Sequence, residues 1–344
     1  MPSADATETL LALYRTMVRI RAFEDAAEQA SRGGLAAWGP QTEQAEGGAP
    51  AQVRGPLHLS TGQEAVPTGV CAHLNADDPI TSTHRGHGHT LAKGADLQRM
   101  MMELFGKAGG FCGGRGGSMH IADFSVGMLG ANGVVAASIP IAVGAAHAIR
   151  LQGRPAIATA FFGDGAINRG PFAESLNWAA AYRLPLLFVC EDNQWSATTR
   201  TDTLSAGEGA AARARAFGID AVEVDGNDVE AVHERAGRLV EQIRNSGQPA
   251  LLHARTYRFK GHVSVDPAAY RDPAELAQAL KRDPLTIARE RLASRGIEAS
   301  AIAALDDAAR DEVRAALAAA AAAPWPSVTA AFEEIQTIGA GTWL

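Results

Sequence analysis

The sequence predicts an α/β fold with a doubly wound, mostly parallel sheet and helical extensions at the N- and C-terminal ends. Two continuous apolar runs, at residues 156–162 and 185–190, have the character of strands that are buried on both faces. A helical stretch at about 171–182 lies between them, and the same alternation continues to about residue 260. Strands that alternate with helices in this way form a parallel sheet with crossover helices.

The chain before the sheet has two parts. Residues 7–32 are expected to form an amphipathic helix, because apolar side chains recur there at helical spacing. Residues 33–55 have no such periodicity and are rich in Gly, Pro, Gln, Glu and Ala, which predicts a long, mobile, inserted loop. The apolar stripe of the helix consists of Leu10, Leu13, Tyr14, Met17, Ile20 and Phe23.

The remaining elements follow in chain order. A short strand or turn is expected at 79–81 and a buried helix at 134–149. Weaker strands are expected at 222–224 and 251–256, with a helix at 228–245 between them. The tail is rich in alanine and is expected to be helical.

These elements divide the chain into three predicted parts. The helix and the inserted loop occupy residues 1–55, and the α/β domain occupies residues 56–265. A helical C-terminal extension covers residues 266–344. A chain of 344 residues is long enough for this arrangement around one large sheet.

Composition excludes several function classes. Hydrophobic residues make up 47% and charged residues 20% of the chain, which is typical of a soluble globular protein with a substantial core. The net charge of −7 and the lack of basic runs argue against nucleic-acid binding. No apolar stretch is long enough to cross a membrane, and the chain start does not resemble a signal peptide. Three scattered cysteines indicate a reducing compartment, so a cytoplasmic location is expected.

Glycine is concentrated in one segment. Seven of the 36 glycines fall between Gly106 and Gly117. Because glycine permits close backbone approach and positive φ, the segment is either a mobile surface loop or an ordered loop near a ligand. Composition alone does not decide between these two interpretations.

Two polar side chains follow the two strongest strand candidates. Asp164 comes directly after the first strand and Asn193 directly after the second, 29 residues later. If the strands are neighbours, both side chains lie at the carboxyl edge of the sheet, where α/β proteins bind ligands. Their oxygen atoms suit Mg²⁺ and a phosphate-bearing ligand, although either residue alone is equally typical of a turn.

Other nucleotide motifs fit less well. Gly163 and Gly165 begin a dinucleotide-binding pattern, but Asn168 stands where its last glycine belongs. A phosphate-binding P-loop is excluded because Ala108 follows Gly106-Lys107.

Histidines offer further candidates. The segment 83–89 (THRGHGH) contains three of them, but no nearby carboxylate or cysteine completes a zinc site. Arg85 on this Gly-flanked loop is a candidate phosphate clamp or a solvated turn residue. His58 and His262 lie in loops and could move protons near neutral pH, although a lone histidine is more often structural.

Taken together, the motifs resemble those of one family. The GDG at 163–165, followed by the polar pair ending at Asn193, resembles the thiamine diphosphate motif. The surrounding segments are similar, in this order, to the α subunit of the first component of 2-oxo acid dehydrogenase complexes, closest to the pyruvate and acetoin types. They are HLSTGQEA at 58–65, THRGHGH at 83–89, GRGGSMH at 114–120, LGANGVV at 129–135 and TYRFKGH at 256–262.

The resemblance implies a role for each matching residue. Mg²⁺ would be bound by the side chains of Asp164 and Asn193 and by the backbone carbonyl of Trp195. His262 would lie beside the cofactor and assist proton or acyl transfer, and His58 would line the substrate pocket. The remaining cofactor contacts would be His84 and Arg85 with backbone near Gly165 and Ala166 for the diphosphate, and the backbone of Gly133 and Val135 for the aminopyrimidine.

The resemblance also implies partners. The family's α chain is half of an enzyme, and a β subunit completes it, usually as two α and two β chains. Typical members act on a small oxo compound and pass the two-carbon unit to the lipoyl arm of an acyltransferase.

A carboligase and a non-catalytic subunit of the same fold stay open as alternative functions. A nicotinamide-dependent dehydrogenase is disfavoured because the dinucleotide-binding glycine pattern is incomplete.

Several positions depart from the family pattern. The inserted loop at 36–53 precedes His58, and our hypothesis is that it alters substrate access or docking of the lipoyl arm. Val263 stands where mitochondrial enzymes carry a regulatory serine, so kinase control of that type is not expected. The other departures are Asp192 for Asn, Trp195 for Tyr, Arg169 for Gln and Lys260 for His.

Overall fold

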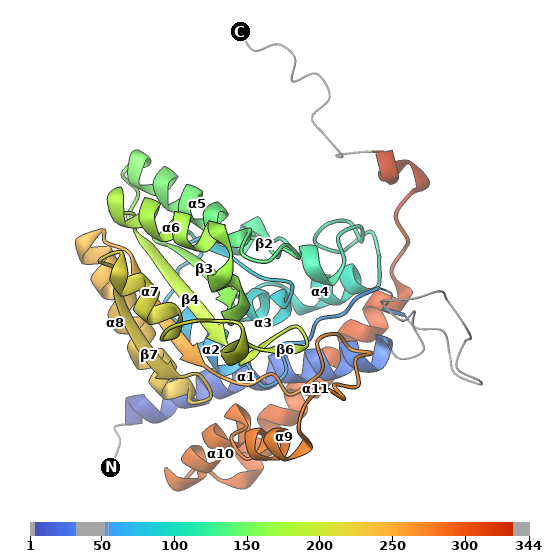
Figure 1. Ribbon diagram of the computed structural model, residues 1–344. Helices are drawn as coiled ribbons and strands as arrows, with labels where there is room; N and C mark the ends of the chain where they lie inside the picture. Colours follow the sequence, from blue (N-terminus) through green and yellow to red (C-terminus); the bar gives the residue numbers. More distant parts are fainter. Residues whose placement is uncertain (1–3, 32–51, 54, 333–344) are drawn as a thin grey trace.

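A six-stranded parallel sheet forms the centre of the computed structural model, which describes residues 4–31, 52–53 and 55–332 (Figure 1). The strand order is β2-β1-β3-β4-β8-β7, and every pairing in this sheet is parallel. The predicted α/β fold is therefore confirmed. The strands are β1 (Ile80–Thr81), β2 (Met128–Gly130), β3 (Ala158–Gly163), β4 (Leu186–Asp192), β7 (Asp220–Asp225) and β8 (Ala250–Arg255).

The two central strands, β3 and β4, are largely apolar because each contributes to a hydrophobic core on both faces of the sheet. Phe161, Leu187 and Val189 belong to one core, whereas the alternating residues Phe162 and Phe188 belong to the other. All five side chains are almost fully buried. This arrangement explains why the sequence shows continuous apolar runs rather than the alternation of a half-exposed sheet.

Helices cover both faces of the sheet. One core joins the sheet to α5, α6 and α7, and the other joins it to α1, α2, α4 and α8. In Figure 1, α5 and α6 run side by side along the first of these faces. The helices on the first face are α5 (Ser138–Gln152), α6 (Gly170–Ala181) and α7 (Gly209–Ala216), and those near the second are α2 (Ala65–Cys71), α3 (Gly86–Ala92), α4 (Leu97–Leu104) and α8 (Val229–Ser246).

The helix expected to be buried at 134–149 is only half-buried. It begins later, at Ser138, and its outer face leaves Ile141 and Leu151 exposed. Ile139 and Ile149, in contrast, are buried against the sheet. The helix is a covering layer with one contact face, so its apolar run did not indicate burial on all sides.

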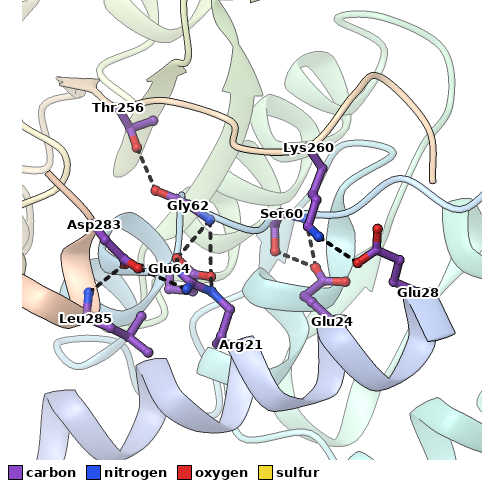
Figure 2. A network of polar contacts seen from close by, with 10 residues as sticks. All are labelled: Arg21, Glu24, Glu28, Ser60, Gly62, Glu64, Thr256, Lys260, Asp283 and Leu285. Carbon is purple, nitrogen blue, oxygen red and sulfur yellow. Dashed lines mark hydrogen bonds and ion pairs between the residues drawn. The ribbon is translucent and has the colours of Figure 1, made fainter. Parts of the chain in front are cut away.

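The N-terminal helix packs against helices from the C-terminal part of the described chain. The N-terminal helix α1 (Ala4–Ser31) contacts α10 (Pro284–Ser294) and α11 (Ala299–Ala322), and α9 (Pro273–Leu280) precedes them. Figure 2 shows Arg21 of α1 between Glu64 and Asp283, with its Nη2 atom 3.0 Å from a carboxylate oxygen of each.

Almost all of the segment 36–53 lies outside the described residues, so its role stays a prediction. Within the described parts of the chain, every helix lacks the combination of length and apolar character that a bilayer crossing requires.

The glycine-rich segment is an ordered loop built around a buried carboxylate. Glu103, at 0% exposure, accepts four backbone N–H groups from this loop. Gly110 packs so closely on Glu103 that an added Cβ would lie 2.6 Å from its Cα. The four donors, at 2.8–3.0 Å, belong to Cys112, Gly114, Gly116 and Gly117. The anion that orders the loop is thus a residue of the chain itself.

Candidate active site

One cavity at the carboxyl end of β3 and β4 collects every residue to which the family resemblance assigns a role. These residues come from segments far apart in the chain, as expected for a site at the carboxyl edge of a doubly wound sheet. Their individual roles stay predictions. The predicted residues that line the cavity are His58, His84, Arg85, Gly133, Val135, Asp164, Gly165, Ala166, Asn193, Trp195 and His262.

Asp164 is a buried carboxylate at the floor of this cavity. It begins the 3₁₀ turn Asp164–Asn168 directly after β3 and is only 4% exposed. Its oxygens accept hydrogen bonds from the Thr201 hydroxyl and from the backbone N–H of Gly165. Burial, together with the nearby Asp192 carboxylate, raises the pKa of Asp164 to about 6. A bound cation next to such a buried carboxylate would stabilise its ionised form.

Asn193 faces the same cavity from the end of β4. Its amide Nδ2 donates to Gln63 Oε1 at 3.0 Å, and its Oδ1 accepts from the backbone N–H of Trp195 at 3.1 Å. Gln194 adopts a positive φ of 68°, which turns the chain sharply after the strand. The Trp195 indole donates to Glu275 at 2.9 Å, so Trp195 can offer only backbone to the cavity while its side chain is anchored elsewhere.

Asp192, one of the departures from the family pattern, has a partner of its own. Its Oδ2 lies 2.9 Å from Nε2 of His253, a buried residue of β8. Burial opposes ionisation of Asp192, but its hydrogen bond with His253 outweighs burial and lowers the pKa of Asp192. Asp192 is therefore held as an anion behind Asp164.

The three histidines of the segment 83–89 do not form a zinc site. His84 faces the cavity, whereas His87 lies 2.9 Å from both Glu24 and Ser118. His89 contacts Ser82 at 2.7 Å and Glu191 at 3.1 Å. His87 and His89 both lie on α3, two residues apart, so their side chains leave the helix in different directions.

A different group of three histidines meets in the cavity. One nitrogen from each of His58, His84 and His262 lies within 4.8 Å of the others. Burial, and the charge of Arg85, lower the pKa of His58 to about 3 and that of His262 to about 4, and they lower the pKa of His84 as well. All three rings are therefore neutral at neutral pH.

The surroundings of this trio are unsuited to a metal ion. A histidine that binds a metal usually donates its second ring nitrogen to an acceptor. His262 Nδ1 instead faces guanidinium donors, and His58 Nδ1 has no hydrogen-bond partner among the described residues. The cationic Arg85 and Arg258 would also repel a metal cation.

Arg85 uses its donors to join two loops. It donates to Leu59 O at 2.7 Å and to His262 O at 2.9 Å, and it is only 4% exposed. Burial, together with Arg258, keeps the pKa of Arg85 well below its ordinary value. A buried guanidinium next to a second one creates positive potential in the cavity, which suits an anionic ligand.

Arg258 is a site residue that sequence reasoning missed. It lies on the loop between β8 and α9, residues 256–271, which we call the strap. Arg258 is 1% exposed, donates to Ala197 O at 3.1 Å, and leaves its Nε unpartnered within the described chain. Burial, with the charge of Arg271, lowers the pKa of Arg258 to about 10. The sequence feature that could have identified Arg258 is its position four residues before His262, inside the quoted segment 256–262.

Two further polar residues of the cavity were also missed. Gln63 supports Asn193, and Glu191 connects the cavity to His89. Both are almost fully buried. Gln63 stands inside the quoted segment 58–65, and Glu191 directly precedes Asp192 at the strand end, so position in a motif was the available signal.

The fold and the cavity define a class of protein. Two oxygen-bearing side chains, Asp164 and Asn193, stand at the carboxyl ends of adjacent parallel strands, and buried arginines supply positive potential in the same cavity. These features define a class: an α/β protein with a ligand cavity at the carboxyl edge of a parallel sheet, suited to an anionic ligand.

The chain belongs to the dehydrogenase E1 component family, whose model matches residues 50–329. It is 45% identical over 270 residues to the alpha subunit of acetoin:2,6-dichlorophenolindophenol oxidoreductase of Cupriavidus necator, which covers 78% of this chain and 76% of the relative. The corresponding subunit of Bacillus subtilis is 43% identical over 274 residues, covering 80% and 77% of the two chains. The pyruvate dehydrogenase E1 component subunit alpha of Rhizobium meliloti is 34% identical over 327 residues, covering 94% and 89%.

These similarities confirm the resemblance seen in the sequence. The chain is an α-type subunit of an E1 dehydrogenase component, and the family implies thiamine diphosphate as cofactor and a β subunit as partner.

Proposed function

We propose that this chain binds thiamine diphosphate through Mg²⁺ and, with a β subunit, oxidatively cleaves acetoin or a 2-oxo acid such as pyruvate. The observation that carries the proposal is the convergence of every predicted site residue on one cavity with Asp164 at its floor. Acetoin is the first donor to test, because the two relatives with 45% and 43% identity are named for it.

The residues around Asp164 fit a divalent cation bound to a diphosphate. The Asp164 carboxylate and the Asn193 amide oxygen are hard ligands, and the Trp195 carbonyl is a third. Burial raises the pKa of Asp164, and a bound divalent cation would compensate this buried charge. Gly165 and Ala166 lie at the start of the same turn and supply backbone next to the diphosphate.

The other side of the cavity faces the substrate. His58, His84 and His262 are neutral there and can form hydrogen bonds without adding charge. The bound cofactor supplies a nucleophilic carbon and an electron sink for bond cleavage. The chain's own residues orient the donor, stabilise developing negative charge and restrict water.

A β subunit would cover the open side of the cavity. Val134 and Val135, at 68% and 49% exposure, form an apolar rim beside Gly133. Exposed valines at a cavity edge are suited to burial by a partner chain. We propose an assembly of two α and two β chains, with a lipoyl acyltransferase as acceptor of the two-carbon unit.

The test is turnover by the chain purified together with its β subunit. Thiamine diphosphate and Mg²⁺ are supplied, acetoin and pyruvate are offered separately, and a redox dye accepts the electrons. We expect dye reduction with one donor and a loss of more than 100-fold in Asp164→Ala. Arg238→Ala, at an exposed position of α8, is the matched control and should keep normal activity.

Each negative outcome indicates one alternative. Bound cofactor with no dye reduction, but with coupling of two carbonyl compounds, would identify a carboligase. Failure to bind thiamine diphosphate in the complex would identify a non-catalytic subunit and would overturn the proposal.

A further inference from the structure

Two arginines hold one nitrogen of the His262 ring. Arg85 Nη2 lies 3.1 Å from His262 Nδ1, and Arg258 Nη1 lies 3.3 Å from the same atom. A guanidinium has only donors and no acceptor, so both contacts require a lone pair on Nδ1. In a neutral imidazole the proton must then be on Nε2.

The position of the ring is fixed as well. Arg85 donates to the backbone oxygen of His262 at 2.9 Å, and Asp266 accepts from its backbone N–H at 2.6 Å. Lys260 ties the same strap to α1 through an ion pair of 2.7 Å with Glu28, as Figure 2 shows. With its backbone anchored on both sides, the ring presents Nδ1 to the arginines, and His262 lines the cavity.

We propose that Arg85 and Arg258 lock His262 in its Nε2-protonated form and make it a neutral hydrogen-bond donor to the ligand in the cavity. This inference rests on the proposed function, because it assigns the role of His262 within that site. Arg258 is then a positioning residue, since it acts through His262.

The charged and titratable groups around His262 support a neutral ring. They are Arg85, Arg258, His58, His84 and Asp266. Only Asp266 is acidic, and its nearest contact is with the backbone N–H rather than the ring. Burial and the two guanidinium groups lower the pKa of His262 to about 4, so an imidazolium does not form near neutral pH.

The consequence for chemistry differs from the role implied by the family resemblance. A ring whose lone pair is occupied by arginines cannot remove a proton as a base. It can donate Nε2–H to a carbonyl oxygen that gains negative charge as the donor substrate is attacked. His262 would then stabilise the oxyanion rather than relay protons.

The test is the tautomer of His262 in the full free chain, labelled with ¹⁵N-histidine. Two-bond ¹⁵N–¹H spectra distinguish a protonated from a bare ring nitrogen, and His262→Gln identifies the signal by its loss. We expect a protonated Nε2 and a bare Nδ1 that do not change between pH 6 and pH 8. A proton on Nδ1, or titration within this range, would overturn the inference.

Variants at the strap test the cause. Arg258→Met should weaken the lock, so that part of the signal moves to the Nδ1-protonated form or begins to titrate, and Arg258→Lys should restore the original spectrum. Arg238→Gln, at an exposed position of α8, is the control and should leave the spectrum unchanged. A spectrum of Arg258→Met identical to that of the unaltered chain would remove Arg258 from the proposal.

The tautomer measurement does not depend on turnover. A locked tautomer in a chain that forms no active complex would leave this inference intact and would contradict the proposed function. An active complex in which the His262 tautomer is not fixed would support the proposed function and contradict this inference. The unaltered chain provides the decisive spectrum even if a variant fails to fold.

Discussion

Asp164 shows how a binding residue can lower the stability of the chain that carries it. Its pKa of about 6, in place of 3.8, means that folding opposes its ionisation. The penalty begins above pH 3.8, is complete above pH 6, and amounts to about 3 kcal/mol. A residue kept at such a cost is typical of a functional site.

We therefore expect Asp164→Asn to stabilise the free chain while abolishing Mg²⁺-dependent cofactor binding. The free energy of unfolding at pH 7.5 should rise by about 1–3 kcal/mol, measured by urea denaturation. Asp202→Asn, an exposed change on a neighbouring loop, should alter neither quantity appreciably. A less stable Asp164→Asn chain would show that the carboxylate is already compensated.

Residue by residue, the sequence predicted the parts of the site that follow a strand or stand in a motif. Asp164 and Asn193 could be placed together because parallel strands end at the same edge of a sheet. Arg258 could not be placed, because its position depends on how the strap folds to bring Arg258 beside Ala197 and the His262 ring. Such contacts between loops leave no periodic signal in the chain.

The glycine-rich loop is an element whose order depends on one side chain. Both carboxylate oxygens of Glu103 accept two backbone N–H groups each. The same loop leads to Ser118, which contacts His87, and to Met119, which lines the cavity. The loop thus transmits the position of α4 to one wall of the candidate active site.

Glu103→Gln should destabilise this loop more than the loss of one charge suggests. The new amide N–H₂ group would face two backbone donors, leaving buried groups unpaired, which costs about 2–4 kcal/mol. Urea denaturation measures the change in unfolding free energy, and amide hydrogen exchange at 112–117 should accelerate. Glu234→Gln on the exposed face of α8 is the control and should cost less than about 0.5 kcal/mol. Unchanged exchange at 112–117 would show that the glycines hold the loop without Glu103.

At the level of elements, the sequence predicted strands and helices better than their layers. The strand expected at 156–162 is β3, Ala158–Gly163, and the helix expected at 228–245 is α8, Val229–Ser246. The partial exposure of α5 was not predicted, because an apolar run does not reveal how many faces a helix buries. The packing of α11 on α1 joins residues almost 300 positions apart and has no local signature.

Across the whole molecule, buried neutral histidines couple stability to pH. Burial lowers the pKa of His58 to about 3 and of His262 to about 4, and it lowers the pKa of His73, His84 and His233. The unfolded chain takes up protons on these side chains near pH 6.5, whereas the folded chain does not. Stability therefore falls as the pH falls below 6.5, because the unfolded state then binds more protons.

The free chain should consequently lose stability steeply between pH 6.5 and about pH 4. Between its folded and unfolded pKa values, each of these histidines lowers the free energy of unfolding by at most about 1.4 kcal/mol per pH unit of acidification. Solvent screening makes this contribution smaller for the partly exposed histidines. Urea denaturation at pH 7.5, 6.5 and 5.5 measures the slope, and His58→Gln should make the slope shallower by the share of one histidine. Cofactor and Mg²⁺ should raise stability at every pH through preferential binding to the folded state. Protonation of Asp164 near pH 6 offsets only part of this loss, because one carboxylate opposes several histidines. Equal unfolding free energies at pH 7.5 and 5.5 in Asp164→Asn, where this offset is absent, would contradict the neutral surroundings argued for the cavity histidines.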